Sequence, residues 1–183
     1  MIYLDNAATT PVLPEALQAA WPYLTNEFGN ASSKHELGFR AAKALTEARE
    51  KVANWLGCRA SEIVFTSSGT ESNNLAIKGI ALASPRGKHI ISARTEHESV
   101  LQCLDYLERI HGFEIEWMPL SETGEIAIDS LRGSIRDDTT LITLMLANNE
   151  TGVIQDVAAL ANAASGTGAW FHSDAVQALG KLP

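Results

Sequence analysis

The chain has 183 residues, of which 45% are hydrophobic and 20% are charged, a composition typical of a folded globular protein and too apolar for intrinsic disorder. Fourteen Lys and Arg against 22 Asp and Glu give a net charge of −8, with no basic run, so a nucleic acid is not expected as a partner. No apolar stretch approaches the roughly 20 residues of a membrane-spanning helix. The N-terminus, MIYLDNAATT, lacks the features of a signal peptide, and we therefore expect a cytoplasmic protein.

The two cysteines, Cys58 and Cys103, are too few for a disulfide framework and show neither CxxC nor zinc-ligand spacing. Each is expected to be a small buried hydrophobic residue. The sequence therefore predicts no metal site.

A helix is predicted in the first third of the chain, where apolar residues recur every three or four positions from Leu37 to Trp55. Ser33 and Glu36, three residues apart, predict a capping box at its start. Gly57 is placed where a left-handed residue would end it.

The rest of the chain alternates between strands and helices. Strands are predicted for five short runs rich in β-branched and aromatic residues, at 62–66, 88–92, 114–118, 141–146 and 169–172. Helices are predicted between them, at 70–82, 97–110, 129–135 and 157–164. This alternation predicts an α/β fold with a mainly parallel sheet that helices cover on both faces.

Ligands of such sheets bind beyond the carboxyl ends of the strands. Four segments fall there in the predicted order, 67–71, 93–97, 147–151 and 173–177. They hold most of the unusual polar residues of the chain, so we expect the functional site among them.

The segment TSSGTESNN, residues 66–74, is predicted to open a helix. Ser68 and Glu71 would form a capping box, and Gly69 and Thr70 would leave free backbone N–H groups that suit a phosphate monoester. The alternative is a simple helix cap. The segment matches neither the P-loop nor the dinucleotide-binding fingerprint.

Two further loops carry candidate ligand groups. His97 precedes a predicted helix, where a neutral imidazole could stack on an aromatic cofactor, or could simply be a hydrogen-bonded surface residue. The adjacent amides Asn148 and Asn149 could donate to a ligand oxygen, although a plain turn explains them equally well.

Asp174 directly follows an apolar predicted strand, where an unpaired carboxylate would be costly to bury. It therefore needs a cationic partner, either a protonated pyridine nitrogen or an Arg or Lys elsewhere in the chain. Gln177, one helical turn later, could reach the same ligand.

Together, these motifs resemble the cysteine desulfurases of the NifS/IscS type, which are fold-type I pyridoxal phosphate (PLP) enzymes. The matching motifs are YLDNAATTP (3–11), FGNASSKHELG (28–38), EIVFTSSGTESNNLAIKG (62–79), TEH (95–97), NNETG (148–152) and HSDAVQALGKLP (172–183). Ala31 is found where the family usually has proline, and Ser173 where it usually has a small apolar residue.

The resemblance implies a three-layer αβα fold of the aspartate aminotransferase-like type. Residues 1–13 would be an N-terminal arm belonging to a small domain, and residues 14–183 an incomplete PLP-binding large domain.

The same resemblance implies the cofactor contacts. Gly69 and Thr70 would hold the PLP phosphate, and the ring would stack under His97. His97 and Asp174 would be the catalytic residues, with Asp174 on the pyridine nitrogen.

Two other contacts come from the resemblance alone. Asn149 would bond near the ring hydroxyl, and Gln177 would bond the phenolate oxygen.

The implied reaction removes sulfur from L-cysteine and leaves L-alanine and a persulfide on an enzyme cysteine. Sulfur-acceptor or scaffold proteins would be the partners, in iron–sulfur cluster and thio-cofactor synthesis, and the full enzyme would be a homodimer. Neither the Schiff-base lysine motif SxHK nor the persulfide cysteine is present. Lys181 does not match that motif, so we expect an N-terminal fragment that is inactive alone.

Two alternatives remain open. One is a selenocysteine lyase or a related PLP lyase, because the motifs bind the cofactor and do not select sulfur. The other is a non-catalytic remnant of the PLP domain that acts as a binding module.

Overall fold

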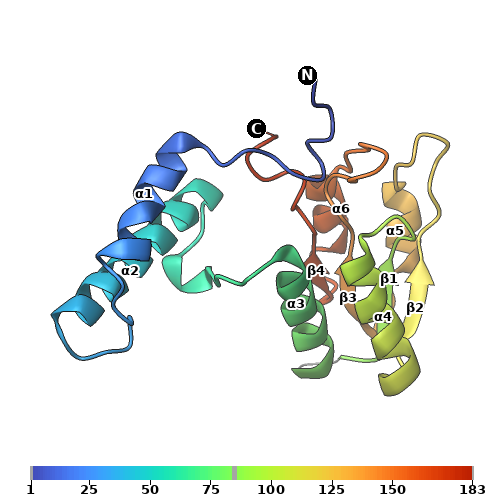
Figure 1. The fold of residues 1–183 in the computed structure, drawn as a ribbon. Helices are drawn as coiled ribbons and strands as arrows, with labels where there is room; N and C mark the ends of the chain where they lie inside the picture. The colour runs from blue at the N-terminus through green and yellow to red at the C-terminus, as the bar shows by residue number, and fades with distance from the viewer. Residues whose placement is uncertain (1, 84–85, 183) are drawn as a thin grey trace. The chain divides into compact units, whose positions relative to one another are not determined.

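The computed structural model describes residues 2–83 and 86–182. The chain divides into two compact units, Met1–Phe65 and Thr66–Pro183, and the elements of each can be followed by label and colour in Figure 1. All the site residues predicted from the sequence belong to the second unit.

The second unit is built on a sheet of four parallel strands in the order β2-β1-β3-β4. The strands are β1 (His89–Ser92), β2 (Glu114–Trp117), β3 (Thr139–Thr143) and β4 (Trp170–His172). Ile90 pairs with Ile115 on one side and Leu141 on the other. Every residue of β1 and β3 is buried, as expected for strands covered on both faces.

Helices cover the two faces of this sheet (Figure 1). On one face, α3 (Gly69–Ala83) and α4 (Glu98–His111) pack around Ile90 and Leu141. On the other, α5 (Ile128–Ser134) and α6 (Val157–Ala164) pack around Ile91 and Ile142. Neighbouring strand residues thus pack into the hydrophobic cores on opposite faces of the sheet. The predicted three-layer αβα arrangement is confirmed.

The helix α4 shows how local sequence sets these elements. Val100, Leu104 and Leu107 follow helical spacing and are fully buried. The helix ends at Gly112, which has φ 68°, a left-handed conformation that glycine adopts without steric cost.

One predicted strand is wrong. The run 62–66 contains the end of a short 3-10 helix, Ala60–Glu62, and then continues as an extended segment. No described strand pairs with this segment, and Val64 remains 66% exposed. A β-branched run forms a strand only where a neighbour accepts its backbone hydrogen bonds.

The first unit contains α1 (Pro14–Thr25) and α2 (Glu36–Leu56), followed by that 3-10 helix. The predicted capping role of Ser33 is wrong, because His35 is the N-cap and its Nδ1 accepts from Gly38 N–H at 3.3 Å. The predicted stop at Gly57 is confirmed by its φ of 69°. The division into an arm at 1–13 and a domain at 14–183 stays a prediction.

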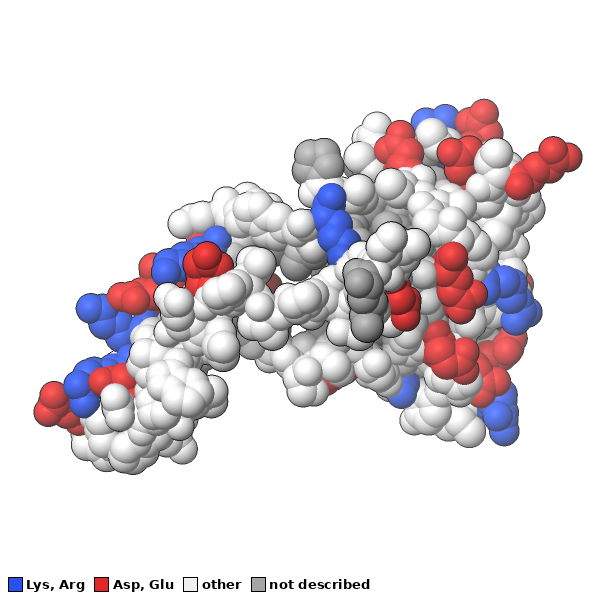
Figure 2. Space-filling model, turned by 45° about the horizontal axis from the view of Figure 1, so that its top comes forward, with Lys and Arg blue, Asp and Glu red and all other residues white. Residues whose placement is uncertain are grey.

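Figure 2 shows acidic and basic side chains mixed over the face that it presents. None of the described helices combines the length and apolar character needed to cross a membrane.

Candidate active site

The loops at the carboxyl end of the sheet are tied to one another by hydrogen bonds. Asn148 Nδ2 donates to the Thr95 carbonyl at 2.8 Å, and Met145 N–H donates to Glu96 Oε1 at 2.7 Å. Leu146 N–H donates to the Asp174 carbonyl at 2.9 Å. The segment after β3 therefore connects the loop after β1 to the loop after β4, as the parallel arrangement predicts.

The helix α3 begins at Gly69. Ser68 Oγ accepts from Glu71 N–H at 3.2 Å, while Glu71 Oε2 accepts from Ser67 Oγ and Ser67 N–H, both at 2.6 Å. The predicted capping box is therefore wrong in one half, because the glutamate bonds Ser67 and not Ser68. Hydrogen bonds from the Ser67 side chain and then from its backbone lower the pKa of Glu71.

The N–H groups of Gly69 and Thr70 have no acceptor among the described residues. They lie at the positive end of a 15-residue helix. Two backbone donors are therefore available for an anion at this turn.

Gly69 also brings this turn against the loop that follows β4. A Cβ at position 69 would lie 2.7 Å from Cγ2 of Val176, well inside a van der Waals contact. Only glycine allows this approach, which brings the free N–H groups close to the segment that carries Asp174.

The carboxylate of Asp174 is buried, with 7% of the residue exposed. Its Oδ2 accepts from Asn73 Nδ2 at 2.8 Å, and its Oδ1 accepts from Val176 N–H at 3.0 Å. No Lys or Arg of the described chain forms an ion pair with it. A buried carboxylate held only by neutral donors favours a cationic ligand.

His97 is the N-cap of α4, and its Nδ1 accepts from Ser99 N–H at 3.1 Å. Ser99 Oγ lies 2.8 Å from the same nitrogen and 2.9 Å from Asn73 Nδ2. His97 is exposed, while Ser99 and Asn73 are buried. Side chains therefore link the imidazole to Asp174.

Asn148 and Asn149 behave differently. Asn148 Oδ1 accepts from the N–H groups of Glu150 at 2.9 Å and Thr151 at 2.7 Å, and so folds the loop back on itself. The half-buried side chain of Asn149 makes no hydrogen bond to a described residue. Asn148 thus holds the loop, which leaves Asn149 available to a ligand.

Gln177 is half-buried in the loop after β4, and its Oε1 accepts from Lys181 Nζ at 2.6 Å. A ligand that used this oxygen would compete with that ammonium group.

Two titratable groups lie buried behind the loops. Burial, and then the nearby Asp174 charge, raise the pKa of Glu96 to about 8 against the opposing hydrogen bond from Met145 N–H. Burial lowers the pKa of His172, whose Nδ1 lies 2.8 Å from Thr143 Oγ1. At neutral pH the region therefore holds a protonated acid and a neutral imidazole beside Asp174.

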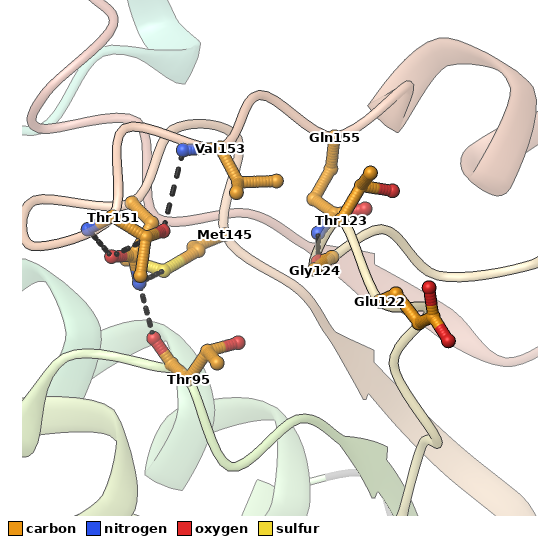
Figure 3. A pocket seen from close by; sticks show the side chains of 9 residues that line it. Thr95, Glu122, Thr123, Gly124, Met145, Thr151, Val153 and Gln155 are labelled. Atoms are coloured by element: carbon orange, nitrogen blue, oxygen red, sulfur yellow. Dashed lines mark hydrogen bonds between the residues drawn. The ribbon is translucent and has the colours of Figure 1, made fainter.

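A cavity of about 330 Å³ lies beside these loops. Figure 3 shows Thr151 and Val153 on one side of it and Glu122 and Thr123 on the other. Gln155 joins the two sides, because its Nε2 donates to the Gly124 carbonyl at 2.8 Å. The residues that line the cavity include Asn148, but none of the residues to which the family resemblance gives a cofactor contact. No group of three or more potential metal ligands occurs among the described residues.

Sequence reasoning missed several residues of this site. Asn73 lies four residues after Gly69, a spacing that places both on one face of the predicted helix. Ser99 lies two residues after His97, and no such spacing indicates its role. Glu96 belongs to the TEH motif, but nothing in the sequence indicates that its side chain turns inward to Met145.

The comparisons with known proteins agree with this arrangement. Residues 2–183 match the family Aminotransferase class-V, and the chain belongs to that family. All 183 residues align with proteins named cysteine desulfurase IscS, at 48% identity in Methanosarcina thermophila and 47% in Dictyoglomus turgidum. The chain spans 45% and 46% of those relatives, or less than half of their length.

The solved structures that resemble the chain have the fold of fold-type I PLP enzymes. A NifS-like protein matches all of it with a TM-score of 0.94 and 37% identity, over 50% of that protein. DndA from Streptomyces lividans matches all of it with a TM-score of 0.86 and 42% identity, over 51% of that protein. A structure described as SspA in complex with cysteine matches 93% of it with a TM-score of 0.89 and 38% identity, over 49% of that protein.

Membership of this family implies a PLP cofactor, and the chemistry of the loops fits one. The buried carboxylate of Asp174 suits a protonated pyridine nitrogen, and the free N–H groups of Gly69 and Thr70 suit a phosphate. The exposed ring of His97 and the free amide of Asn149 belong to the same group of loops.

Proposed function

We propose that the protein acts as a PLP-dependent cysteine desulfurase. The proposed reaction takes sulfur from L-cysteine, leaves L-alanine and forms a persulfide on an enzyme cysteine. The observation that carries this proposal is the buried carboxylate of Asp174, without a cationic partner in the described chain and joined through Asn73 and Ser99 to His97. The relatives named cysteine desulfurase support the choice of substrate.

Each site residue has a proposed role in holding the cofactor. Gly69 N–H, Thr70 N–H and the Thr70 hydroxyl bind the phosphate at the positive end of α3. Asp174 accepts the pyridine N–H. When bound, PLP supplies an electron sink at the substrate α-carbon.

Other side chains orient the ligand and handle protons. His97 contacts the ring and offers a nitrogen for proton movement at the substrate. Asn149 and Gln177 bind the ring oxygen. Glu96 holds a proton behind the site near neutral pH.

The wider setting is part of the same proposal. The persulfide sulfur passes to acceptor or scaffold proteins for iron–sulfur clusters and thio-cofactors, and the enzyme works as a homodimer. We place it in the cytosol, because Cys58 and Cys103 are free thiols.

The test compares two variants in the protein expressed from its complete reading frame. Asp174→Ala is expected to lower turnover of L-cysteine by about a hundredfold or more, because it removes the anion that pairs with the cofactor nitrogen. Thr70→Ala is expected to weaken PLP retention by about tenfold through the loss of one phosphate contact. Sulfide release and the PLP content after dialysis are the measurements.

Asp129→Ala and Thr46→Ala are the matched controls, because both side chains are exposed and neither has an assigned role in the site. Near-normal turnover and PLP content in both site variants would refute the assigned roles. Faster turnover of L-selenocysteine than of L-cysteine would instead make the enzyme a selenocysteine lyase.

A further inference from the structure

Four residues from three separate segments of the sequence form one hydrogen-bonded series, the relay, which runs from Asp174 through Asn73 and Ser99 to His97. Asn73 Nδ2 lies 2.8 Å from Asp174 Oδ2 and 2.9 Å from Ser99 Oγ. Ser99 Oγ in turn lies 2.8 Å from His97 Nδ1. The contacts of Asn73 join residues 101 and 26 positions away, so the folded unit brings them together and no local turn does.

The chemistry of the groups sets the direction of each hydrogen bond. A carboxylate only accepts, so the amide turns its NH₂ group toward Asp174, and the second N–H points to Ser99 Oγ. The hydroxyl accepts from Asn73 and donates its own proton to His97 Nδ1. Ser99 N–H points to the same ring nitrogen at 3.1 Å. Nδ1 is therefore an acceptor, and the neutral ring carries its proton on Nε2.

The middle of this chain is shielded from water. Asn73 is 4% exposed and Ser99 is 8% exposed, whereas His97 at the outer end is exposed. Hydrogen bonds in such surroundings are strong, and their loss leaves polar groups without partners. The two middle residues thus hold the outer groups more firmly than exposed side chains would.

We propose that Asn73 and Ser99 are positioning residues, which join the His97 imidazole and the Asp174 carboxylate into one hydrogen-bonded unit. This inference rests on the proposed function, because the two joined groups are those assigned to the cofactor ring. The relay fixes Nδ1 as the acceptor and turns the Nε2 proton toward the ligand. It also fixes the direction of one oxygen of the carboxylate.

The first test uses the complete protein without cofactor, with ¹⁵N-labelled histidine, at a pH of about 8 where free imidazole is neutral. Ser99→Ala is expected to move the ¹⁵N chemical shift of His97 Nδ1 toward that of an unprotonated ring nitrogen that accepts fewer hydrogen bonds. Ser99→Thr keeps a hydroxyl and is expected to restore it. Asn73→Leu is expected to move the resonance in the same direction by less. His97→Gln assigns the signal.

The second test measures the PLP dissociation constant in the same variants. Ser99→Ala and Asn73→Leu are each expected to raise the PLP dissociation constant about three- to tenfold. Because both changes interrupt the same relay, the constant of the double variant should not exceed the larger of the two single-variant constants. Ser130→Ala on α5 and Asn162→Leu on α6 are the controls.

The outcomes separate this inference from the proposed function. An Nδ1 resonance that does not move in Ser99→Ala overturns the relay, even if PLP binds well. The relay is also overturned if the fold-change in the PLP dissociation constant of the double variant equals the product of the two single-variant fold-changes. If the resonance moves as expected while the wild-type protein binds no PLP, the relay stands and the proposed function fails. If Asn73→Leu does not fold, the comparison of Ser99→Ala with Ser99→Thr still tests the relay.

Discussion

The two ends of the sheet differ in how fully their polar groups are paired with one another. At the amino end, buried His89 lies between Thr139 Oγ1 at 2.9 Å and Glu116 Oε2 at 3.1 Å. Beside it, Arg136 pairs with Glu114 at 2.9 Å and with Asp138 at 2.8 Å. Here the charged and polar side chains satisfy one another.

At the carboxyl end, partners are missing. Three buried side-chain oxygens of the described residues have no hydrogen-bond partner, namely Ser92 Oγ, Glu96 Oε2 and Ser173 Oγ, and all three lie at or after the end of a strand. In the same region, the N–H groups of Gly69 and Thr70 have no acceptor within residues 2–83 and 86–182. Native structures rarely leave such groups without a partner, so these groups at the carboxyl end are available to a ligand. Four predictions test this difference.

The largest effect is expected for Glu96→Gln, measured as the pH dependence of the free energy of unfolding. Burial raises the folded pKa of Glu96 to about 8, whereas the unfolded value is about 4.3. The folded state therefore binds more protons between these values, and the wild-type protein loses stability as the pH rises through that window. At about 1.4 kcal/mol per pKa unit, the loss by pH 8 is about 4 to 5 kcal/mol.

Urea unfolding of the cofactor-free protein from pH 5 to pH 9 measures this effect. The Gln variant should lack that part of the pH dependence. Its free energy of unfolding should therefore rise relative to that of the wild type as the pH increases. Glu98→Gln, an exposed neighbour on α4, is the control and should follow the wild-type curve. Parallel curves for wild type and Glu96→Gln would show that the carboxyl end carries no such buried acid.

At the amino end, His89→Ala is expected to lower the free energy of unfolding by about 2 to 3 kcal/mol. The change removes a fully buried ring and leaves Thr139 and Glu116 without their shared partner. PLP retention should stay at the wild-type level, because no ligand contact is assigned there. His111→Ala, in an exposed contact with Tyr106, is the control and should cost little. A loss of PLP as large as in Thr70→Ala would remove the distinction between the two ends.

Gly69→Ala is expected to weaken PLP retention by about tenfold, or about 1.4 kcal/mol. The added Cβ would meet Val176 Cγ2 at 2.7 Å and push the turn away from the loop that carries Asp174. Val176→Ala in the same protein removes that clash and should restore most of the binding. Gly79→Ala, on the same helix, meets nothing within 4 Å and should slightly stabilise the protein. Equal retention in Gly69→Ala and Gly79→Ala would mean that the close approach is not required.

The sequence predicted features that depend on nearby residues. The helix predicted at 97–110 corresponds to α4, and the predicted order of strands and helices placed Asp174 and His97 at the same end of the sheet. The run 62–66 shows the limit, because its β propensity was real but whether a strand forms depends on a neighbour.

The candidate site shows the same limit. The contact between Asn73 and Asp174 spans 101 residues, and the inward turn of Glu96 depends on one backbone N–H, that of Met145 in the segment after β3. Such contacts are set by tertiary packing and leave no periodic signal in one sequence.

The smallest effect is expected for Arg136→Gln, at the paired amino end. The guanidinium lowers the pKa of Glu114 and of Asp138, mainly through side-chain hydrogen bonds. A carboxyl whose folded pKa is lowered stabilises the protein above its unfolded pKa and loses that contribution as the pH falls through the folded value. Wild type and variant should therefore differ slightly in urea midpoint at pH 7, and the difference should shrink as the pH falls below the unfolded carboxyl value of about 4.

High salt should also remove the difference, because these groups are exposed and their attraction is screened. Arg132→Gln on α5, whose exposed partner is Asp129, provides a matched pair outside the sheet. A PLP dissociation constant that changes in Arg136→Gln would mean that charge at the amino end reaches the ligand site. An unchanged constant, together with the losses expected for Gly69→Ala and Thr70→Ala, would confine ligand binding to the end where two backbone donors lack acceptors and Asp174 lacks a cationic partner within the described chain.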